Sequence, residues 1–362
     1  MFKSDYQETF SQITASDATY RRILTMKKEK QKRTSAGVAS KLLIAAVMIS
    51  LLAVTASATG LTSWFGGFFT ETHGEPLSQG QVDYIEEKTQ SVDLSQTVDG
   101  YTISLKQAIT DGSKTYVALA VTAPEGTDLS QAPQEGYQLQ TVYPSMDIRT
   151  ADESYTVTSY ATYWREDNDG KANTMDIAMM MDSYDMGLSQ NVQWKLSVSG
   201  LFADCLNTEL DEQLKAKYAG QENVMYTDEE SAALYAHLPL VQGNWTFTFR
   251  LENTSQPKEL LTAPIGVPAS IGWTPDGQDV LEEITVNSIT LRELSATIRY
   301  DGEYADFSYG DKVRVGMHDG SEIILRVDGG TTGEEYFYAD APIAFAEVDY
   351  LIFPDGTKVP VV

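Results

Sequence analysis

An uncharged segment near the N-terminus most constrains how this chain can fold. Between Leu42 and Thr70 there is no Asp, Glu, Lys or Arg. A helix needs about 20 apolar residues to cross a bilayer core, so the sequence predicts a transmembrane helix at 42–62. A cleaved export signal is the alternative, since Ala56–Ala58 resembles a cleavage site, although such signals have shorter apolar stretches after a short basic start. The sole cysteine, Cys205, lies far from this segment, which argues against a lipid anchor.

The flanking charges predict the orientation of this span. Residues 1–41 carry nine basic and four acidic side chains, and after the span only Lys88 precedes Lys106. Because Lys and Arg beside a span stay cytoplasmic, we expect the N-terminus inside the cell and the C-terminus outside, in a single-pass protein of the cell membrane. Aromatic rings are enriched at membrane interfaces. The residues expected at the two interfaces are Lys41, Trp64, Phe65, Phe68 and Phe69.

The net charge divides between the two sides of the predicted membrane. The whole chain carries −26 and residues 1–41 carry about +5, which leaves about −31 for the rest. So acidic an outer region disfavours nucleic acid as a partner. The basic cluster Lys27–Arg33 could contact anionic lipid or serve only as a topology signal. A single cysteine forbids an intramolecular disulfide, so core packing must hold the outer region.

The region after the span is predicted to be antiparallel β structure. "GYTISLKQA" and "NWTFTFRLE" alternate apolar and polar residues, as half-buried strands do. Asp-Gly pairs between such segments favour tight hairpin turns. The sequence therefore predicts a mainly β chain, with one N-terminal transmembrane helix and two extracellular antiparallel β-sandwich domains of immunoglobulin-like type.

The predicted organisation has six parts. They are a cytoplasmic basic segment with a short amphipathic helix (1–41), the span (42–62), a juxtamembrane stalk with a short helix at 81–88 (63–95), a first sandwich with a helical insertion near 207–239 (96–252), a linker (253–281) and a second sandwich (282–362).

No pattern in the sequence predicts a catalytic, cofactor or metal site, so we expect no enzyme and no cofactor. The three histidines lack the spacing of a zinc-binding helix, and no nucleophile elbow or phosphate loop occurs. Residues 165–176 fail as a calcium loop, because Arg165 and Asp176 stand where Asp and Glu are needed. Met179–Met181 and the strand tryptophans are interpreted as core. These tryptophans are Trp164, Trp194 and Trp245.

The cytoplasmic segment contains the best candidate for partner binding. Ser16 can cap a helix, and Tyr20, Ile23 and Leu24 then share one apolar face. A lone helix of this length is marginal in water, so it would form against a partner or the bilayer. The alternative is an unstructured tail that only orients the span.

Four stretches give the chain a family resemblance. They are "RRILTMKKEKQKR", "LTSWFGGFF", "VDGYTISLKQAITDGSKTYVALAV", and "GNWTFTFRL" followed by "ITVNSITLRELSATIRY". With them the chain resembles bacterial membrane proteins that carry the domain of unknown function 4179, many of which look like anti-sigma factors. The resemblance implies that the cytoplasmic segment sequesters an extracytoplasmic-function sigma factor and that the outer domains sense an envelope signal. It carries over no catalytic or ligand-binding residue.

These observations lead to a hypothesis of a one-pass transducer, with a membrane protease as a possible further partner. The sequence "AVTASATG" in the outer half of the span has low helix propensity, which could favour its entry into an intramembrane protease. The alternative is ordinary helix packing, because Ala56 and Gly60 also fit a contact between small residues. The alternative is an anchored adhesion or cell-wall-binding protein without a regulatory tail. An extracellular hydrolase, a third class, predicts titratable residues clustered in a pocket.

Overall fold

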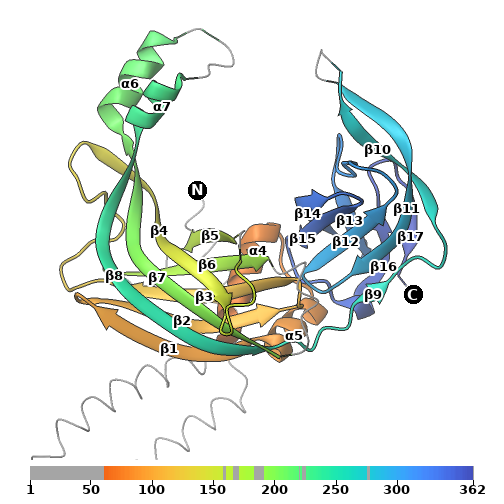
Figure 1. Cartoon of the computed structure of the whole chain (residues 1–362), viewed down its shortest axis with the longest axis horizontal. Coiled ribbons are helices and arrows are strands. Elements are labelled where there is room, and N and C mark those ends of the chain that lie inside the picture. The colour runs from red at the N-terminus through yellow and green to blue at the C-terminus, as the bar shows by residue number, and fades with distance from the viewer. Residues whose placement is uncertain are drawn as a thin grey trace, which may run out of the picture. The chain divides into compact units, whose positions relative to one another are not determined.

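Antiparallel strands dominate the structure, which is a computed structural model (Figure 1). It describes residues 61–157, 160–165, 171–182, 191–219, 221, 226–274 and 278–361. The prediction of a mainly β, antiparallel chain is confirmed. The strands form two groups, called here the first β unit (residues 90–252) and the second β unit (residues 258–360), and both belong to one compact body.

The first β unit contains two antiparallel sheets packed over one core. One sheet has the order β1 (Gln90–Val98), β2 (Tyr101–Thr110), β3 (Lys114–Thr122), β6 (Thr174–Asp182), β5 (Tyr160–Arg165). The other has the order β4 (Tyr137–Thr150), β7 (Asn191–Asn207), β8 (Tyr235–Glu252). Both sheets contribute buried side chains to the same cluster, among them Leu105, Leu119, Met179, Leu196, Trp245 and Phe247.

The core assignments made from the sequence hold for this unit. Trp194 and Trp245 are buried between the sheets, as expected. Met179 and Met181 join the same core, and Met180 points to the opposite face of β6, where it is buried in a second cluster. The alternation of a strand therefore sends the methionine run into two separate cores. The side chain of Trp164 lies outside the described side chains.

Two helices cover the outer face of the five-stranded sheet. They are α4 (Leu61–His73) and α5 (Gln79–Lys88). β3 is consequently buried on both faces, with Tyr116 and Ala118 toward the helices and Val117 and Leu119 toward the other sheet. Neither α4 nor the burial of both faces of β3 was predicted from the sequence. The short helix predicted at 81–88 corresponds to α5, and the segment 63–95, expected as a stalk, also contributes α4 and part of β1 to the fold.

A helical insertion follows β7, close to where the sequence predicts it. α6 (Thr208–Lys217) begins at the capping side chain of Asn207, and α7 (Asp228–Leu234) begins at that of Thr227. The insertion was predicted near 207–239, but β8 already begins at Tyr235. Leu206 pairs with Tyr235 in the sheet, so the insertion sits at the end of the long β7–β8 hairpin (Figure 1).

The second β unit is one nine-stranded antiparallel sheet. Its order is β10 (Ile265–Trp273), β11 (Asp279–Leu291), β12 (Ser295–Tyr300), β15 (Glu334–Ala339), β14 (Glu322–Thr331), β13 (Val313–Met317), β16 (Val348–Ile352), β17 (Lys358–Pro360), with β9 (Lys258–Glu259) beside β11. A short 3₁₀ turn, η2 (Phe345–Glu347), precedes β16. Val267 on β10 and Val359 on β17 share one core, so the sheet curls around that core. The predicted linker 253–281 in fact contributes β9, β10 and the start of β11.

Several sequence-based predictions fall outside the described residues. These are the span at 42–62 apart from its last two positions, the central residues of the tested calcium loop, and Tyr20, Ile23, Leu24 and Lys41. Within the described ranges, no helix combines the length and apolar character that crossing a bilayer requires. The same ranges hold no group of three or more His, Cys, Asp or Glu side chains placed to bind a metal ion.

Candidate functional site

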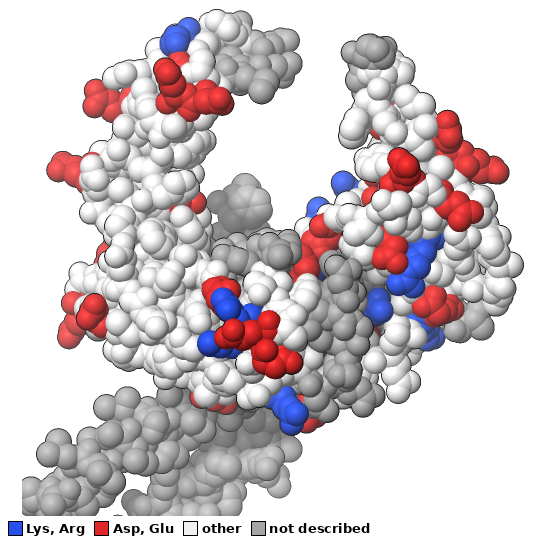
Figure 2. All heavy atoms as spheres, viewed as in Figure 1, with Lys and Arg blue, Asp and Glu red and all other residues white. Residues whose placement is uncertain are grey.

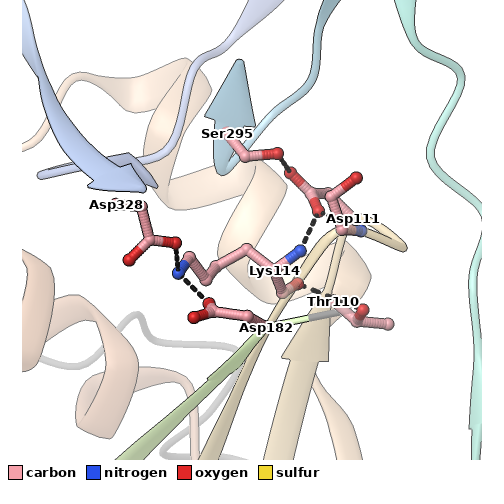
Figure 3. Close-up of polar contacts among 7 residues, drawn as sticks. Thr110, Asp111, Lys114, Asp182, Ser295 and Asp328 are labelled. Carbon is pink, nitrogen blue, oxygen red and sulfur yellow. Dashed lines mark hydrogen bonds and ion pairs between the residues drawn. The ribbon is translucent and has the colours of Figure 1, made fainter. Parts of the chain in front are cut away.

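The two β units meet around a buried lysine (Figure 3). Lys114 opens β3 and its side chain is 0% exposed. Its ammonium group pairs with Asp182, its cross-strand neighbour at the end of β6, and with Asp328 on β14 of the second β unit. The ring of Tyr338 on β15 lies 5.3 Å from the same nitrogen. One cation therefore joins carboxylates from both β units. We call Lys114, Asp182 and Asp328 the lysine clamp.

A neighbouring turn makes a second connection between the units. Asp111 is buried in the β2–β3 turn, and its Oδ1 accepts hydrogen bonds from the amides of Ser113 (2.9 Å) and Lys114 (2.7 Å). Its Oδ2 accepts hydrogen bonds from the Leu294 amide (3.0 Å) and the Ser295 hydroxyl (2.7 Å) of the second β unit. The same carboxylate thus shapes the turn that presents Lys114 and holds the loop between β11 and β12.

Burial controls the electrostatics of the clamp. Desolvation raises the pKa of Asp182, and the Lys114 ammonium opposes that rise by favouring the carboxylate. Buried ion pairs add little net stability over apolar residues, but removing one partner leaves an uncompensated charge. The lysine clamp therefore connects the two β units only while its buried charges compensate one another. It presents no paired nucleophile and base.

Aromatic residues of α4 pack beside the lysine clamp. Phe65, Phe68 and Phe69 are buried, and the ring centroids of Phe68 and Phe69 lie 5.6 Å and 5.2 Å from that of Tyr116 on β3. Leu294 of the second β unit and Met180 complete the cluster. α4 therefore packs against both β units at once.

The aromatic residues expected at the outer membrane interface all lie on α4. Phe65, Phe68 and Phe69 lie against protein atoms, and the indole of Trp64 donates a hydrogen bond to Asp176 (2.9 Å). Their spacing, with pairs four residues apart, is that of one apolar helix face. What the sequence did not reveal is the surface that this face covers.

The C-terminal end of α4 and the start of α5 are tied to the second β unit. His73 Nδ1 lies 3.2 Å from Oδ1 of the buried Asp340, whose pKa is raised by burial. The Ser78 hydroxyl donates a short hydrogen bond to Glu347 and accepts one from the Gln81 amide at 3.2 Å, which caps α5. A pocket of about 670 Å³ opens here. Residues that line it include His73, Ser78, Gln81, His318, Glu322 and Glu347.

We expect Ser78→Ala to lower the free energy of unfolding by about 1 kcal/mol, which is typical for loss of a helix N-cap. The variant also deprives Glu347 of a hydrogen-bond donor. Denaturant titration of the full chain measures the change. Ser91→Ala, at an exposed serine of β1, is the matched control, and a surface change of this kind stays within about 0.5 kcal/mol. Equal effects at the two serines would show that the cap is unimportant.

No residue of the lysine clamp was singled out from the sequence. Lys114 and Asp182 lie at the ends of strands, where charged residues are normally solvated. The one available signal was the Asp-Gly turn at Asp111, which correctly indicated a tight connection. The partner residues on the second β unit gave no local signal.

Comparison with known proteins identifies one family model. The model described as "Domain of unknown function (DUF4179)" matches residues 27–123, a range that includes α4, α5, Asp111 and Lys114. No curated protein matches the chain significantly. Among solved structures, the chain is similar to one described as "The crystal structure of the conserved domain protein from Bacillus anthracis". The sequence identity is 12% and the TM-score 0.42, over 74% of this chain and 77% of that one.

Proposed function

We propose that this protein is a membrane-anchored regulator that resembles an anti-sigma factor. The observation that carries the proposal is the position of α4. This helix begins at Leu61, where the predicted span ends, and its aromatic face is buried against both β units. A disturbance of either β unit therefore reaches the residues next to the membrane.

In this proposal the chain has three working parts. The extracellular β units sense an envelope signal, and their acidic side chains, spread over the visible face in Figure 2, keep them in solution. α4 and the clamp couple them to the span. The cytoplasmic segment sequesters a sigma factor through Tyr20, Ile23 and Leu24, and a membrane protease acting on the span releases it. No catalytic step by this chain is required.

Affinity purification of the full-length protein from its host tests the proposal. We expect a sigma factor to co-purify with the wild type and to fall at least tenfold in an Ile23→Asp/Leu24→Asp variant, because charges on the apolar face oppose its burial. Ser11→Asp/Gln12→Asp is the matched control outside that face, and it should retain the sigma factor. Direct binding with the two purified proteins must reproduce the difference.

The competing function is an anchored adhesion or cell-wall-binding protein. If no sigma factor accompanies the wild type, and the outer region binds wall polymer, the regulatory proposal fails and the adhesion function takes its place.

A further inference from the structure

A second pocket lies on the second β unit, away from the lysine clamp. Its volume is about 590 Å³, and it lies between the connection from β12 to β13 and the strands β14 and β15. The lining residues used below are Tyr300, Glu303, Tyr304, Asp306, Ser308 and Glu335. The proposed function assigns no role to any of them.

Two polar groups on the pocket wall have unused hydrogen-bonding capacity. Glu335 on β15 is 5% exposed, and within the described residues the Phe307 amide (3.2 Å) is the only hydrogen-bond donor to its carboxyl group. The Ser308 hydroxyl is buried and has no hydrogen-bond partner among the same residues. Buried polar groups are normally satisfied, so the Glu335 carboxyl group can accept a further hydrogen bond from a polar ligand in the pocket.

The pocket also offers an exposed aromatic surface. Tyr304 is 49% exposed and Val327 44% exposed, and both line the pocket. The Tyr300 hydroxyl accepts a hydrogen bond from the Ala305 amide (3.1 Å), which fixes the loop that carries Tyr304. An exposed ring beside buried polar groups suits a ligand that has an apolar ring face and polar edges.

The charge of the lining selects among such ligands. Glu334 is already paired with Arg299 (2.5 Å) and accepts a hydrogen bond from the Tyr336 hydroxyl. Glu303 and Asp306 then face a single lining cation, Lys312, and the buried Glu335 adds a carboxyl group that can ionise when a cation arrives. The remaining excess of carboxyl groups favours a ligand that brings a positive charge.

We propose that this pocket binds a protonated amino sugar, with the ammonium group at Glu335 and Asp306 and the sugar ring against Tyr304. The inference rests on the proposed function in one respect, since it names the chemical class of the external signal. A cation close to an aromatic ring gains further attraction.

The protonation of Glu335 supports this assignment. Burial, helped by the nearby Asp306 and opposed by the hydrogen bond from the Phe307 amide, raises the pKa of Glu335 to about 8. The free protein therefore holds this carboxyl largely protonated at pH 7. An arriving ammonium favours the carboxylate, so binding at pH 7 releases a proton to the buffer. Tyr300, Tyr304, Glu303, Glu334 and Lys312 are the other titratable groups lining the pocket.

Calorimetric titration of the full chain with two trisaccharides tests the proposal. The probes are the trimers of glucosamine and of N-acetylglucosamine, which differ in charge and in the acetyl group on each ring. We expect the glucosamine trimer to bind at least tenfold more tightly, with a heat that depends on the buffer because protons are released. Equal binding of the two trimers, or binding of neither, would overturn the proposal.

Variants locate the site and separate it from the proposed function. Glu335→Gln and Tyr304→Ala should each weaken binding at least tenfold, whereas Tyr235→Ala, at a tyrosine 50% exposed on β8, should not. The melting temperature of Glu335→Gln at pH 8 should be no lower than that of the wild type, since the substitution removes a carboxyl group whose ionisation is opposed by burial.

Unchanged affinity in Glu335→Gln overturns the proposed site. Failure of sugar binding with sigma-factor capture intact overturns this inference alone, and the reverse result overturns only the proposed function.

Discussion

Replacing Lys114 with methionine should lower the free energy of unfolding by about 3–5 kcal/mol, the usual cost of removing one partner from a buried charged group. The substitution keeps most of the apolar length of the side chain but leaves Asp182 and Asp328 facing each other without a cation. Denaturant unfolding of the full-length protein, followed by tryptophan fluorescence, measures the loss. Trp194 and Trp245 in the first core make this signal sensitive to the unit that carries Lys114.

Two further variants show whether the loss comes from uncompensated charge. Lys215→Met, at an exposed lysine of α6, makes the same chemical change and should alter stability by less than about 0.5 kcal/mol. The triple variant Lys114→Met/Asp182→Asn/Asp328→Asn should regain much of the loss, because neutral groups cost less to bury. If Lys114→Met behaves like Lys215→Met, the clamp does not hold the β units together.

The strands of the fold were predictable because their signals are local. "NWTFTFRLE" alternates at every second residue, and the structure buries Trp245, Phe247, Phe249 and Leu251 on one face of β8. Asp-Gly pairs at Asp111 and Asp319 likewise lie in connections between adjacent antiparallel strands. Each of these features depends on a few neighbouring residues and on the two-residue period of a strand.

The site was not predictable in the same way because its parts are distant in sequence. Lys114 and Asp328 are separated by 214 positions, and nothing in either local pattern indicates the other. A charged residue at a strand end is usually solvated, so the local sequence around Lys114 does not indicate that its side chain is buried. The curled sheet of the second β unit shows the same limit, since its closure depends on contacts between the first and last strands of the sheet.

The aromatic residues of α4 show that a local pattern can predict an apolar helix face without predicting what that face packs against. Spacing alone identifies an apolar helix face, but lipid and protein are equally suitable surfaces for it. The neighbouring uncharged segment favoured lipid in the sequence analysis. In the structure the face covers β2, β3 and β6, and this burial makes α4 the physical connection on which the proposed signalling depends.

Phe69→Ala should therefore lower the free energy of unfolding by about 3–5 kcal/mol, as truncation of a fully buried phenylalanine does. The ring packs edge-on against Tyr116 at 5.2 Å and against Phe68 at the same distance, so its loss leaves a cavity between α4 and β3. Hydrogen exchange of the full chain should show faster exchange in α4 than in β7.

Phe69→Leu, which fills most of the space, should cost less than about 1.5 kcal/mol. Trp273→Ala is the control for removing a large exposed ring (65% exposed), and it should leave exchange in α4 unchanged. If Phe69→Ala leaves α4 as protected as in the wild type, the helix is not held by its aromatic face, and the proposed coupling between the β units and the predicted span has no structural basis.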